Sequence, residues 1–453
     1  MSLHWAQRLF IMNNRERIQK RIERDKARRA AKKAAWMKDL DDYGKCFDFE
    51  HVWETGIKCG HGVNWKASVQ RYELFLLTNA AELYQALESG SWQKNTGKFC
   101  RFTLYERGHR RDIRSVRINE RNGQKCLCDY SLVTTAQHSL IYDNGATMKN
   151  KGITFAEKRI SLMLRRFLSE VGAEAALRDG YAVIYDFHGY FDSADHGILF
   201  RFLERTYTDT RLIGTVEKLI SDFGSRGLGL GSQISQILAL VLASPLDHDL
   251  KDRAGVKYYA RYMDDGIAIL PTKAEAAAVL GRIRESAAAL GLELNDKKTR
   301  IVKLSRGFTF LKIRYVITPT GRIVRRICRD GIKRMRRRLR AYRRKLDAGT
   351  IDLENIEMSM EAYFANCDRA NSGRTKFEFW KRFRRMFPES GAFLKSRAGP
   401  KMLPEAAAFA ERWRAENPGK SRQEMVRAWK ALQKERAEDK HGLLQVSYRR
   451  KNR

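Results

Sequence analysis

The stretch that decides the fold is residues 258–270, which read Tyr-Tyr-Ala-Arg-Tyr-Met-Asp-Asp-Gly-Ile-Ala-Ile-Leu. Two apolar runs of β-favouring residues flank the adjacent carboxylates Asp264 and Asp265, a pattern typical of a tight β-hairpin with charge at its tip. An Asp-Asp pair in a turn is most often a plain solvated turn. A chemical role would require cations, because the two charges repel, and Mg²⁺ is the usual ion beside a phosphorylated substrate.

A third carboxylate favours a catalytic metal site over a plain solvated turn. Residues 181–186, Tyr-Ala-Val-Ile-Tyr-Asp, form an apolar run that predicts a buried strand ending at Asp186. One carboxylate from a strand and two from a hairpin suit a pair of metal ions, which stabilise the attacking and leaving oxygens of a phosphoryl transfer.

These motifs resemble those of reverse transcriptases. Residues 262–265, Tyr-Met-Asp-Asp, match the family's Tyr-x-Asp-Asp signature, and residues 186–192 resemble its first catalytic motif. The resemblance implies that Asp186, Asp264 and Asp265 are catalytic and bind two Mg²⁺ ions, with Mn²⁺ as the substitute ion.

The same resemblance assigns roles to two aromatic residues that follow Asp186. The backbone carbonyl of Phe187 is expected to assist in metal binding. Phe191 takes the place of a steric gate, whose ring collides with a ribose 2′-hydroxyl and so favours deoxynucleotides. The alternative for Phe191 is an ordinary ring in the core.

A glycine-rich loop, residues 227–236, resembles the second motif of the family. Ser235 and Gln236 keep the pattern and are expected to contact the incoming nucleotide. The loop departs from the family at Gly229, where bacterial relatives usually have Pro, and at Leu230, where many have Gln.

Two later segments complete the resemblance to the palm. Lys298 matches a lysine near the leaving pyrophosphate, where an ammonium neutralises charge or donates a proton, and Lys297 is the reserve. Residues 307–312 resemble the primer-grip motif, although Lys312 stands where relatives usually have Gly.

A hairpin expected over residues 99–114 looks like the fingers hairpin of bacterial reverse transcriptases. It would present Arg110 and Arg111 to the incoming triphosphate, because guanidinium groups bind phosphate oxygens in pairs. An ordinary charged hairpin is the alternative. The helical pattern that precedes it runs from about 65 to 87.

A very basic helix is expected beyond residue 324, and it resembles a thumb helix that presses on a template–primer duplex. Apolar residues Met335, Leu339, Tyr342 and Leu346 repeat at helical spacing and mark its buried face. The arginines proposed to bind nucleic acid are Arg336, Arg337, Arg340, Arg343 and Arg344.

The charge, hydropathy and cysteine content of the chain indicate what it can bind and where it can work. The 453 residues include 88 Lys and Arg against 53 Asp and Glu, a formal charge of +35, which favours a polyanion such as RNA. No apolar stretch is long enough to span a bilayer, and no secretory apolar region follows the first residues. Seven cysteines, an odd number, favour a reducing, cytoplasmic setting over a disulfide framework.

The expected fold is α+β, a right-hand polymerase with fingers, a palm whose antiparallel sheet is backed by helices, and a helical thumb. Basic helical extensions flank it. The expected boundaries are 1–60 for the N-terminal extension, 61–175 for the fingers, 176–318 for the palm, 319–398 for the thumb and 399–453 for the tail.

The function expected from the resemblance is RNA-directed DNA polymerisation from deoxynucleotides, with an RNA/DNA duplex as product. The chain looks most similar to bacterial defence-associated reverse transcriptases, which copy a companion non-coding RNA. A diversity-generating or other retroelement reverse transcriptase is the runner-up. Retron and group II intron reverse transcriptases are also related, but the Val-Thr-Gly signature of the former and the maturase region of the latter are not found. Two further alternatives stay open: a non-catalytic RNA-binding scaffold, and template-independent or protein-primed synthesis. The oligomeric state is not predicted.

Overall fold

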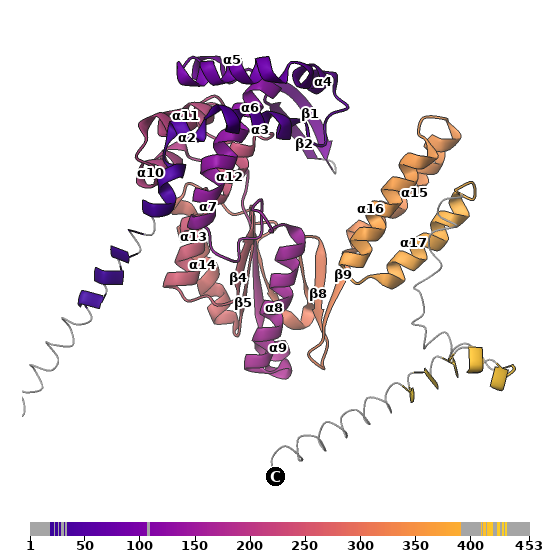
Figure 1. Ribbon diagram of the computed structural model, residues 1–453. Coiled ribbons are helices and arrows are strands. Elements are labelled where there is room, and N and C mark those ends of the chain that lie inside the picture. The colour runs from indigo at the N-terminus through magenta and orange to yellow at the C-terminus, as the bar shows by residue number, and fades with distance from the viewer. Residues whose placement is uncertain are drawn as a thin grey trace, which may run out of the picture. The chain divides into compact units, whose positions relative to one another are not determined.

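The computed structural model describes residues 19–390, except 22, 26, 29–30, 32–33 and 107–108, together with 409, 411–413, 415–419, 424–425, 428–429 and 431–432. The chain divides into two compact units, Met1–Arg326 and Ile327–Arg453 (Figure 1). The predicted fingers and palm both fall within the first unit. The expected basic arm and tail lie partly outside the described residues, although the described part of 19–40 is helical.

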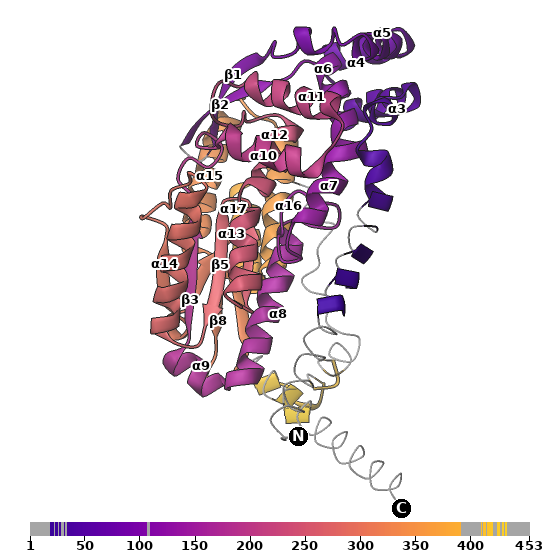
Figure 2. The same cartoon turned by 90° about the vertical axis from the view of Figure 1, so that its left-hand side faces the viewer.

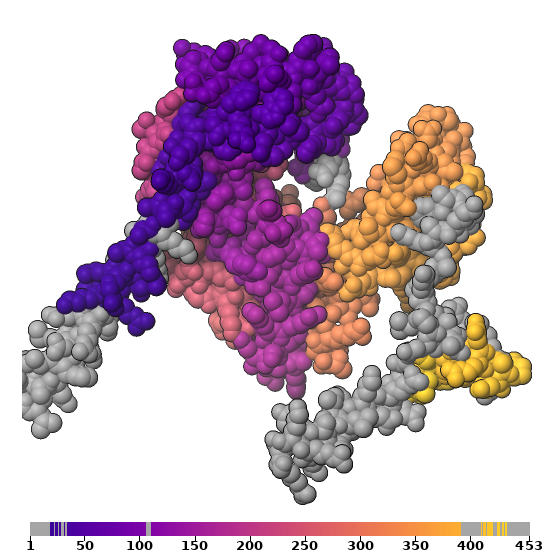
Figure 3. Space-filling model, viewed as in Figure 1, coloured from indigo at the N-terminus to yellow at the C-terminus, as the bar shows by residue number. Residues whose placement is uncertain are grey.

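The N-terminal part of the first unit is a layer of helices with one β-hairpin, seen as the indigo and violet surface in Figure 3. The hairpin is confirmed, although its turn at 107–108 lies outside the described residues. The predicted helix over 65–87 is broken at Phe75. The elements are α2 (Tyr43–Cys46), α3 (Phe49–Gly60), α4 (Ala67–Leu74), α5 (Leu76–Glu88), η1 (Gln93–Asn95), β1 (Cys100–Glu106), β2 (His109–Ser115), α6 (Ile118–Leu127), η2 (Cys128–Leu132) and α7 (Val133–Ser139).

A four-stranded antiparallel sheet forms the centre of the first unit. Its strand order is β4-β5-β3-β6, so that the strand ending in Asp186 lies between the Asp-Asp hairpin and the last strand. The central strand is almost wholly buried, as expected from its apolar run. The strands are β3 (Tyr181–Asp186), β4 (Tyr259–Tyr262), β5 (Asp265–Leu270) and β6 (Arg300–Lys303).

Two long helices back this sheet. α8 (Ile153–Val171) packs against β4 and β5, and α14 (Lys273–Ala289) packs against β3 and β5. Figure 2 shows both helices running alongside the strands. Thr272 caps α14 by accepting a hydrogen bond of 3.2 Å from the N–H of Glu275. The antiparallel palm sheet is thus backed by helices, as expected, and the short α9 (Ala173–Asp179) links α8 to the sheet.

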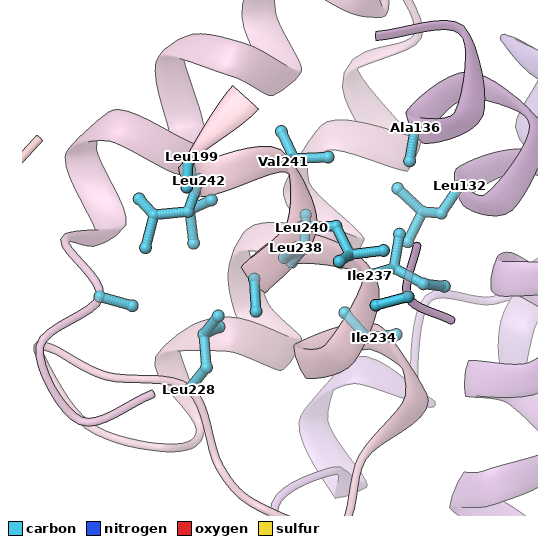
Figure 4. Close-up of a cluster of buried hydrophobic side chains, with 14 of the residues drawn as sticks. Leu132, Ala136, Leu199, Leu228, Ile234, Ile237, Leu238, Leu240, Val241 and Leu242 are labelled. Carbon is cyan, nitrogen blue, oxygen red and sulfur yellow. The ribbon is translucent and has the colours of Figure 1, made fainter. Parts of the chain in front are cut away.

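A cluster of helices between β3 and β4 supplies the largest apolar core. Most of α12 is buried, and its leucines and isoleucines interlock with Leu132, Leu199 and Leu228 (Figure 4). Asp195 caps α10 by accepting a hydrogen bond of 3.2 Å from the N–H of Ile198. The elements are α10 (His196–Thr206), α11 (Thr210–Ser221), α12 (Gln233–Leu242), α13 (Ser244–His248) and η3 (Asp249–Arg253).

A three-stranded sheet follows, in the order β7-β8-β9. Leu311 and Lys312 form the turn between its first two strands, and both have a positive φ, 47° and 66°. Lys312 thus adopts the left-handed conformation that glycine favours, which explains why the relatives use glycine at this point. The elements are η4 (Leu304–Arg306), β7 (Phe308–Phe310), β8 (Ile313–Ile317) and β9 (Ile323–Ile327).

Over residues 327–390 the second unit consists of three helices, α15 (Arg329–Asp347), α16 (Leu353–Arg369) and α17 (Gly373–Met386). Its core is an apolar cluster to which all three helices contribute. The predicted buried face of α15 is confirmed, with Leu346 partly buried. The core residues are Met335, Leu339, Tyr342, Ile356, Met360, Phe364, Phe379, Phe383 and Phe387.

Candidate active site

Strand register brings the three predicted carboxylates to one edge of the palm sheet. Asp186 is the last residue of β3 and pairs directly with Asp265, the first residue of β5. Asp264 lies in the two-residue turn between β4 and β5, and its carbonyl accepts a hydrogen bond of 3.2 Å from the N–H of Phe187. The predicted hairpin is therefore confirmed, with Asp264 in the turn and Asp265 at the start of the strand.

The carboxylates repel one another in a partly desolvated site. Burial and the charge of Asp186 raise the pKa of Asp264 above its ordinary value. Burial, followed by the charges of Asp264 and Asp186, raises the pKa of Asp265 to about 7. The site therefore holds more negative charge than it can keep ionised without a cation.

Lys298 supplies part of that positive charge. Its ammonium donates hydrogen bonds of 2.9 and 2.8 Å to the two carboxylate oxygens of Asp186. Burial opposes the charged form, but these hydrogen bonds and the carboxylate charges raise the pKa of Lys298. Lys298 therefore belongs to the site, although its side chain is exposed, as that of Lys297 is.

The donor set suits divalent cations by its chemistry. Three carboxylates with at least two raised pKa values match the hard oxygen ligands that Mg²⁺ prefers. Within the described residues, however, no group of three or more His, Cys, Asp or Glu side chains is already arranged as a metal centre. In this arrangement the Lys298 ammonium lies on Asp186, so metal binding at that carboxylate requires the ammonium to move.

A buried ion pair beneath the hairpin escaped the sequence reasoning. Arg261 and Asp247 are both fully buried, and their charged groups are joined by hydrogen bonds of 2.7 to 3.0 Å. The hydroxyl of Tyr259 donates a further hydrogen bond of 2.7 Å to Asp247, and the hydroxyl of Tyr185 lies 2.6 Å from that of Tyr259. The network links β3, β4 and α13 directly behind the carboxylates.

Arg261 also holds the turn that carries the carboxylates. Its Nη1 donates a hydrogen bond of 2.8 Å to the carbonyl of Met263, and its Nη2 donates one of 2.8 Å to the carbonyl of Leu240. Met263 has a φ of 54°, a left-handed conformation that costs a residue with a Cβ about 1–2 kcal/mol. Arg261 thus stabilises a strained turn immediately before Asp264, and it acts as a positioning residue.

The two predicted arginines of the fingers hairpin lie on opposite faces. Arg111 pairs across the hairpin with Leu104, and Arg110 pairs with Tyr105, so their side chains alternate. The charge of Arg111 reaches Asp264, where it opposes the rise in pKa. Arg110 instead forms an exposed ion pair of 3.1 Å with Asp112. Only Arg111 is therefore placed on the side of the carboxylates.

The glycine-rich loop connects the fingers hairpin to the palm. The N–H of Arg114 donates a hydrogen bond of 3.1 Å to the carbonyl of Leu230, and the N–H of Leu228 donates one of 2.7 Å to the carbonyl of Phe191. A Cβ on Gly229 would lie 2.0 Å from the ring of Phe223. The family's usual proline therefore cannot stand there without moving that ring. The backbone hydrogen bond from Leu228 places Phe191 beside the glycine-rich loop.

The two polar residues of α12 differ in exposure. Ser235 is 1% exposed and lies on the buried face of the helix, so its hydroxyl does not reach a ligand at the surface. Gln236 is exposed. The arrangement supports Gln236 over Ser235 as a group that contacts a nucleotide.

Four of the five predicted thumb arginines are exposed on α15: Arg336, Arg337, Arg340 and Arg344. Arg343 is the exception. It is half-buried and bonds to Asp347, Glu389 and, at 3.1 Å, the carbonyl of Met386. Arg343 thus stabilises the second unit internally, whereas the other four can bind phosphates.

No helix in the described part of the chain has the length and apolar character needed to cross a membrane.

Comparison with known proteins gives a family and several fold neighbours. Residues 139–315 match the model of the family described as reverse transcriptase (RNA-dependent DNA polymerase). No curated protein sequence matches the chain. Apo telomerase from Candida tropicalis, truncated from its C-terminal domain, is similar at 15% identity over 50% of this chain and 54% of that chain, with a TM-score of 0.37. Telomerase from Candida albicans in complex with the TWJ fragment of telomeric RNA is similar at 12% identity over 69% and 57%, with a TM-score of 0.41.

The chain spans little more than half the length of these telomerase chains. The matched family segment contains β3, β4 and β5, and therefore all three carboxylates and Lys298. The predicted fold class, an α+β right-hand polymerase with an antiparallel palm sheet, is confirmed. Residues 139–315 are therefore similar to the reverse transcriptase domain that this family model describes.

Proposed function

We propose that this protein is an RNA-directed DNA polymerase that extends a primer by nucleotidyl transfer at Asp186, Asp264 and Asp265. The observation that carries the proposal is the register of the palm sheet, which sets Asp186 opposite Asp265 with Asp264 in the adjoining turn. A polymerase needs such a concentration of negative charge to hold the cations that bind its triphosphate substrate.

The reaction joins the primer 3′-oxygen to the α-phosphorus of a deoxynucleoside triphosphate and breaks the α–β phosphoanhydride bond. Two bound Mg²⁺ ions would lower the pKa of the primer hydroxyl and neutralise the triphosphate. Asp186 and Asp264 would hold these ions with the Phe187 carbonyl, and Asp265 would act chiefly through its charge. Lys298, which bonds to Asp186 in the structure, would leave that carboxylate and neutralise the departing pyrophosphate.

Nucleotide selection is assigned to the residues around the glycine-rich loop. Arg111 would bind the triphosphate from the fingers hairpin, and Gln236 would contact the nucleotide from α12. Phe191 would exclude a ribose 2′-hydroxyl. The hydrogen bond from the N–H of Leu228 to the carbonyl of Phe191 supports this role. A steric gate must be held in place to discriminate between deoxynucleotides and ribonucleotides.

The two hairpin arginines should respond differently to removal. Arg111→Ala is expected to raise the KM for deoxynucleotides about 10- to 100-fold, the loss expected for charge-assisted hydrogen bonds to phosphate. Arg110→Ala, on the opposite face of the same hairpin, is the matched control and should change KM less than about threefold. Steady-state kinetics on one template–primer measures both, and equal effects of the two variants would contradict the assignment.

Metal binding should depend on pH because Asp265 has a pKa of about 7. Below that pH a cation must displace a proton, so we expect the affinity for Mg²⁺ to fall up to about tenfold per pH unit. The contribution of Asp265 to the stability of the metal-free fold should also fall as the pH rises from about 4 to 7, because in that range its carboxyl keeps a proton in the folded chain that it loses in the unfolded chain. Mg²⁺ titrations followed by thermal unfolding at about pH 6 and pH 8 test this.

The control for this pH dependence is Asp265→Asn, which removes the titrating group and should flatten the profile. An affinity of the unaltered protein that stays constant across neutral pH would contradict the role given to Asp265.

The template is proposed to be a dedicated non-coding RNA. A formal charge of +35 supports binding to a polyanion, and that binding should weaken steeply with salt. The resemblance to bacterial defence-associated reverse transcriptases supports a cytoplasmic role in defence against phage. Loss of protection in cells that express the Asp264→Asn variant would test the defence role, and unchanged protection would contradict it.

The polymerase proposal is tested on the purified protein with its bound nucleic acid, Mg²⁺ and labelled deoxynucleotides. DNA that ribonuclease pretreatment abolishes, and whose sequence is complementary to the copurified RNA, is the expected product. DNA that survives ribonuclease would favour template-independent synthesis. Copurified RNA without any DNA product would favour the scaffold alternative.

A further inference from the structure

Helix α17 carries a row of aromatic and basic side chains that the polymerase site does not use. The rings of Phe377 and Trp380 are stacked, with centroids 5.9 Å apart and planes 12° from parallel. The Lys381 ammonium lies 4.5 Å from the Phe377 ring, and the Arg384 guanidinium lies 4.8 Å from the Trp380 ring. Spacings of three and four residues place all four side chains along one side of the helix.

This row lies on the side of α17 away from the core of the second unit. Phe379 and Phe383 fill the core, whereas Phe377 is 43% exposed and Lys381 and Arg384 are exposed. Trp380 is only partly buried and packs against the edge of that core. An exposed aromatic ring held by a second ring loses little conformational freedom when a planar ligand stacks on it.

The charge of α17 favours a polyanion as that ligand. The helix contains six basic residues, Arg374, Lys376, Lys381, Arg382, Arg384 and Arg385, and one acidic residue, Glu378. Among the described residues, only Lys376 of these six has an ion pair, which it forms with Asp368. Five cations beside a pair of stacked rings match a strand of phosphates and bases.

The neighbouring helix α15 offers a useful contrast. Its exposed side is also basic, but Tyr342, its only aromatic residue, is buried in the core. α15 can therefore bind phosphates, as the backbone of a duplex requires, but it offers no ring to a base. α17 offers both, and only unpaired bases leave their faces open for stacking.

We propose that the outward side of α17 binds single-stranded RNA, with bases stacked on Phe377 and Trp380 and phosphates bound by the basic residues around them. The choice of RNA over DNA rests on the proposed function, because the template is the single strand that the polymerase must hold. Binding at this surface is separate from synthesis and does not depend on Asp186, Asp264 or Asp265.

The test uses three substitutions of Phe377 in the full-length chain. Phe377→Ala is expected to weaken binding of a short oligouridylate about five- to a hundredfold, the range for loss of one stacked base, without changing the salt dependence. Phe377→Tyr keeps a ring and should restore binding. Phe377→Leu keeps apolar surface without a ring and should not. Arg385→Gln is the charge control and should reduce the salt dependence by about one phosphate contact.

Three further ligands identify what the surface binds, all measured without deoxynucleotides so that polymerase activity plays no part. A blunt RNA–DNA duplex and heparin, a polyanion without bases, should bind Phe377→Ala and the unaltered protein equally. Single-stranded DNA of the same sequence should lose about as much affinity as RNA, because stacking on an aromatic ring tolerates either sugar. An equal loss for heparin, or unchanged RNA binding by Phe377→Ala, would each overturn the proposal, whether or not the protein makes DNA.

Discussion

Asp264→Asn is expected to abolish DNA synthesis while leaving the fold and RNA binding intact. The substitution keeps the shape of the side chain in the turn between β4 and β5 but removes one negative charge from the carboxylate site. Metal ions stabilise such a transition state by several kcal/mol, so the rate should fall by on the order of 10³-fold or more. Asp186→Asn should have an effect of similar size. Single-turnover primer extension measures the rate, and filter binding measures the RNA affinity.

The matched control is Asp179→Asn. This carboxylate is exposed before β3, and its ion pair is with the neighbouring Arg178, 2.9 Å away. The Asp179→Asn variant should leave synthesis unchanged.

Removal of the repulsion between carboxylates should make the Asp264→Asn protein slightly more stable in the absence of metal, because burial and neighbouring charge raise the pKa of Asp264. Synthesis by Asp264→Asn within tenfold of the unaltered rate would exclude this carboxylate from catalysis.

Arg261→Met is expected to destabilise the first unit by about 3–5 kcal/mol, because it leaves the carboxylate of Asp247 buried without a counter-charge. Activity should fall as well, since the carbonyl of Met263 loses its hydrogen-bond donor beside the left-handed turn. Denaturant unfolding measures the stability, and primer extension on protein confirmed as folded measures the activity.

A double variant separates the two roles of Arg261. Arg261→Met with Asp247→Leu replaces the ion pair by apolar side chains and should recover much of the stability, as happens at other buried pairs. It should not recover activity, because no donor then holds Met263. Full recovery of both properties would show that Arg261 serves stability alone and does not position the carboxylates.

Much of the fold could be predicted from sequence because its signals are local. The Asp-Asp hairpin, the strand ending at Asp186 and the helix α8 follow from apolar runs and periodicity. Lys298 follows from the resemblance to the family, and in the structure its ammonium lies on Asp186. At each of these positions, the local sequence pattern agrees with the order in which the family's motifs occur along the chain.

The other features of the site depend on long-range packing, or on which face of a helix or strand a residue occupies. Asp247 looks like an ordinary surface acid in sequence, and only the fold brings it to Arg261. The buried position of Ser235 follows from helical phase, since the buried residues Leu238 and Ala239, three and four positions later, lie on either side of it on the same face of α12. The opposite faces of Arg110 and Arg111 follow from strand alternation, which a motif match alone does not consider.

The measurement that tests the central claim most directly is primer extension on an RNA template of known sequence, with Mg²⁺ and one deoxynucleotide omitted at a time. If the carboxylate site is that of an RNA-directed DNA polymerase, extension will stop at the first template position that requires the missing nucleotide, and Asp264→Asn will give no product. Extension that ignores the template sequence, or that persists in Asp264→Asn, would contradict the claim.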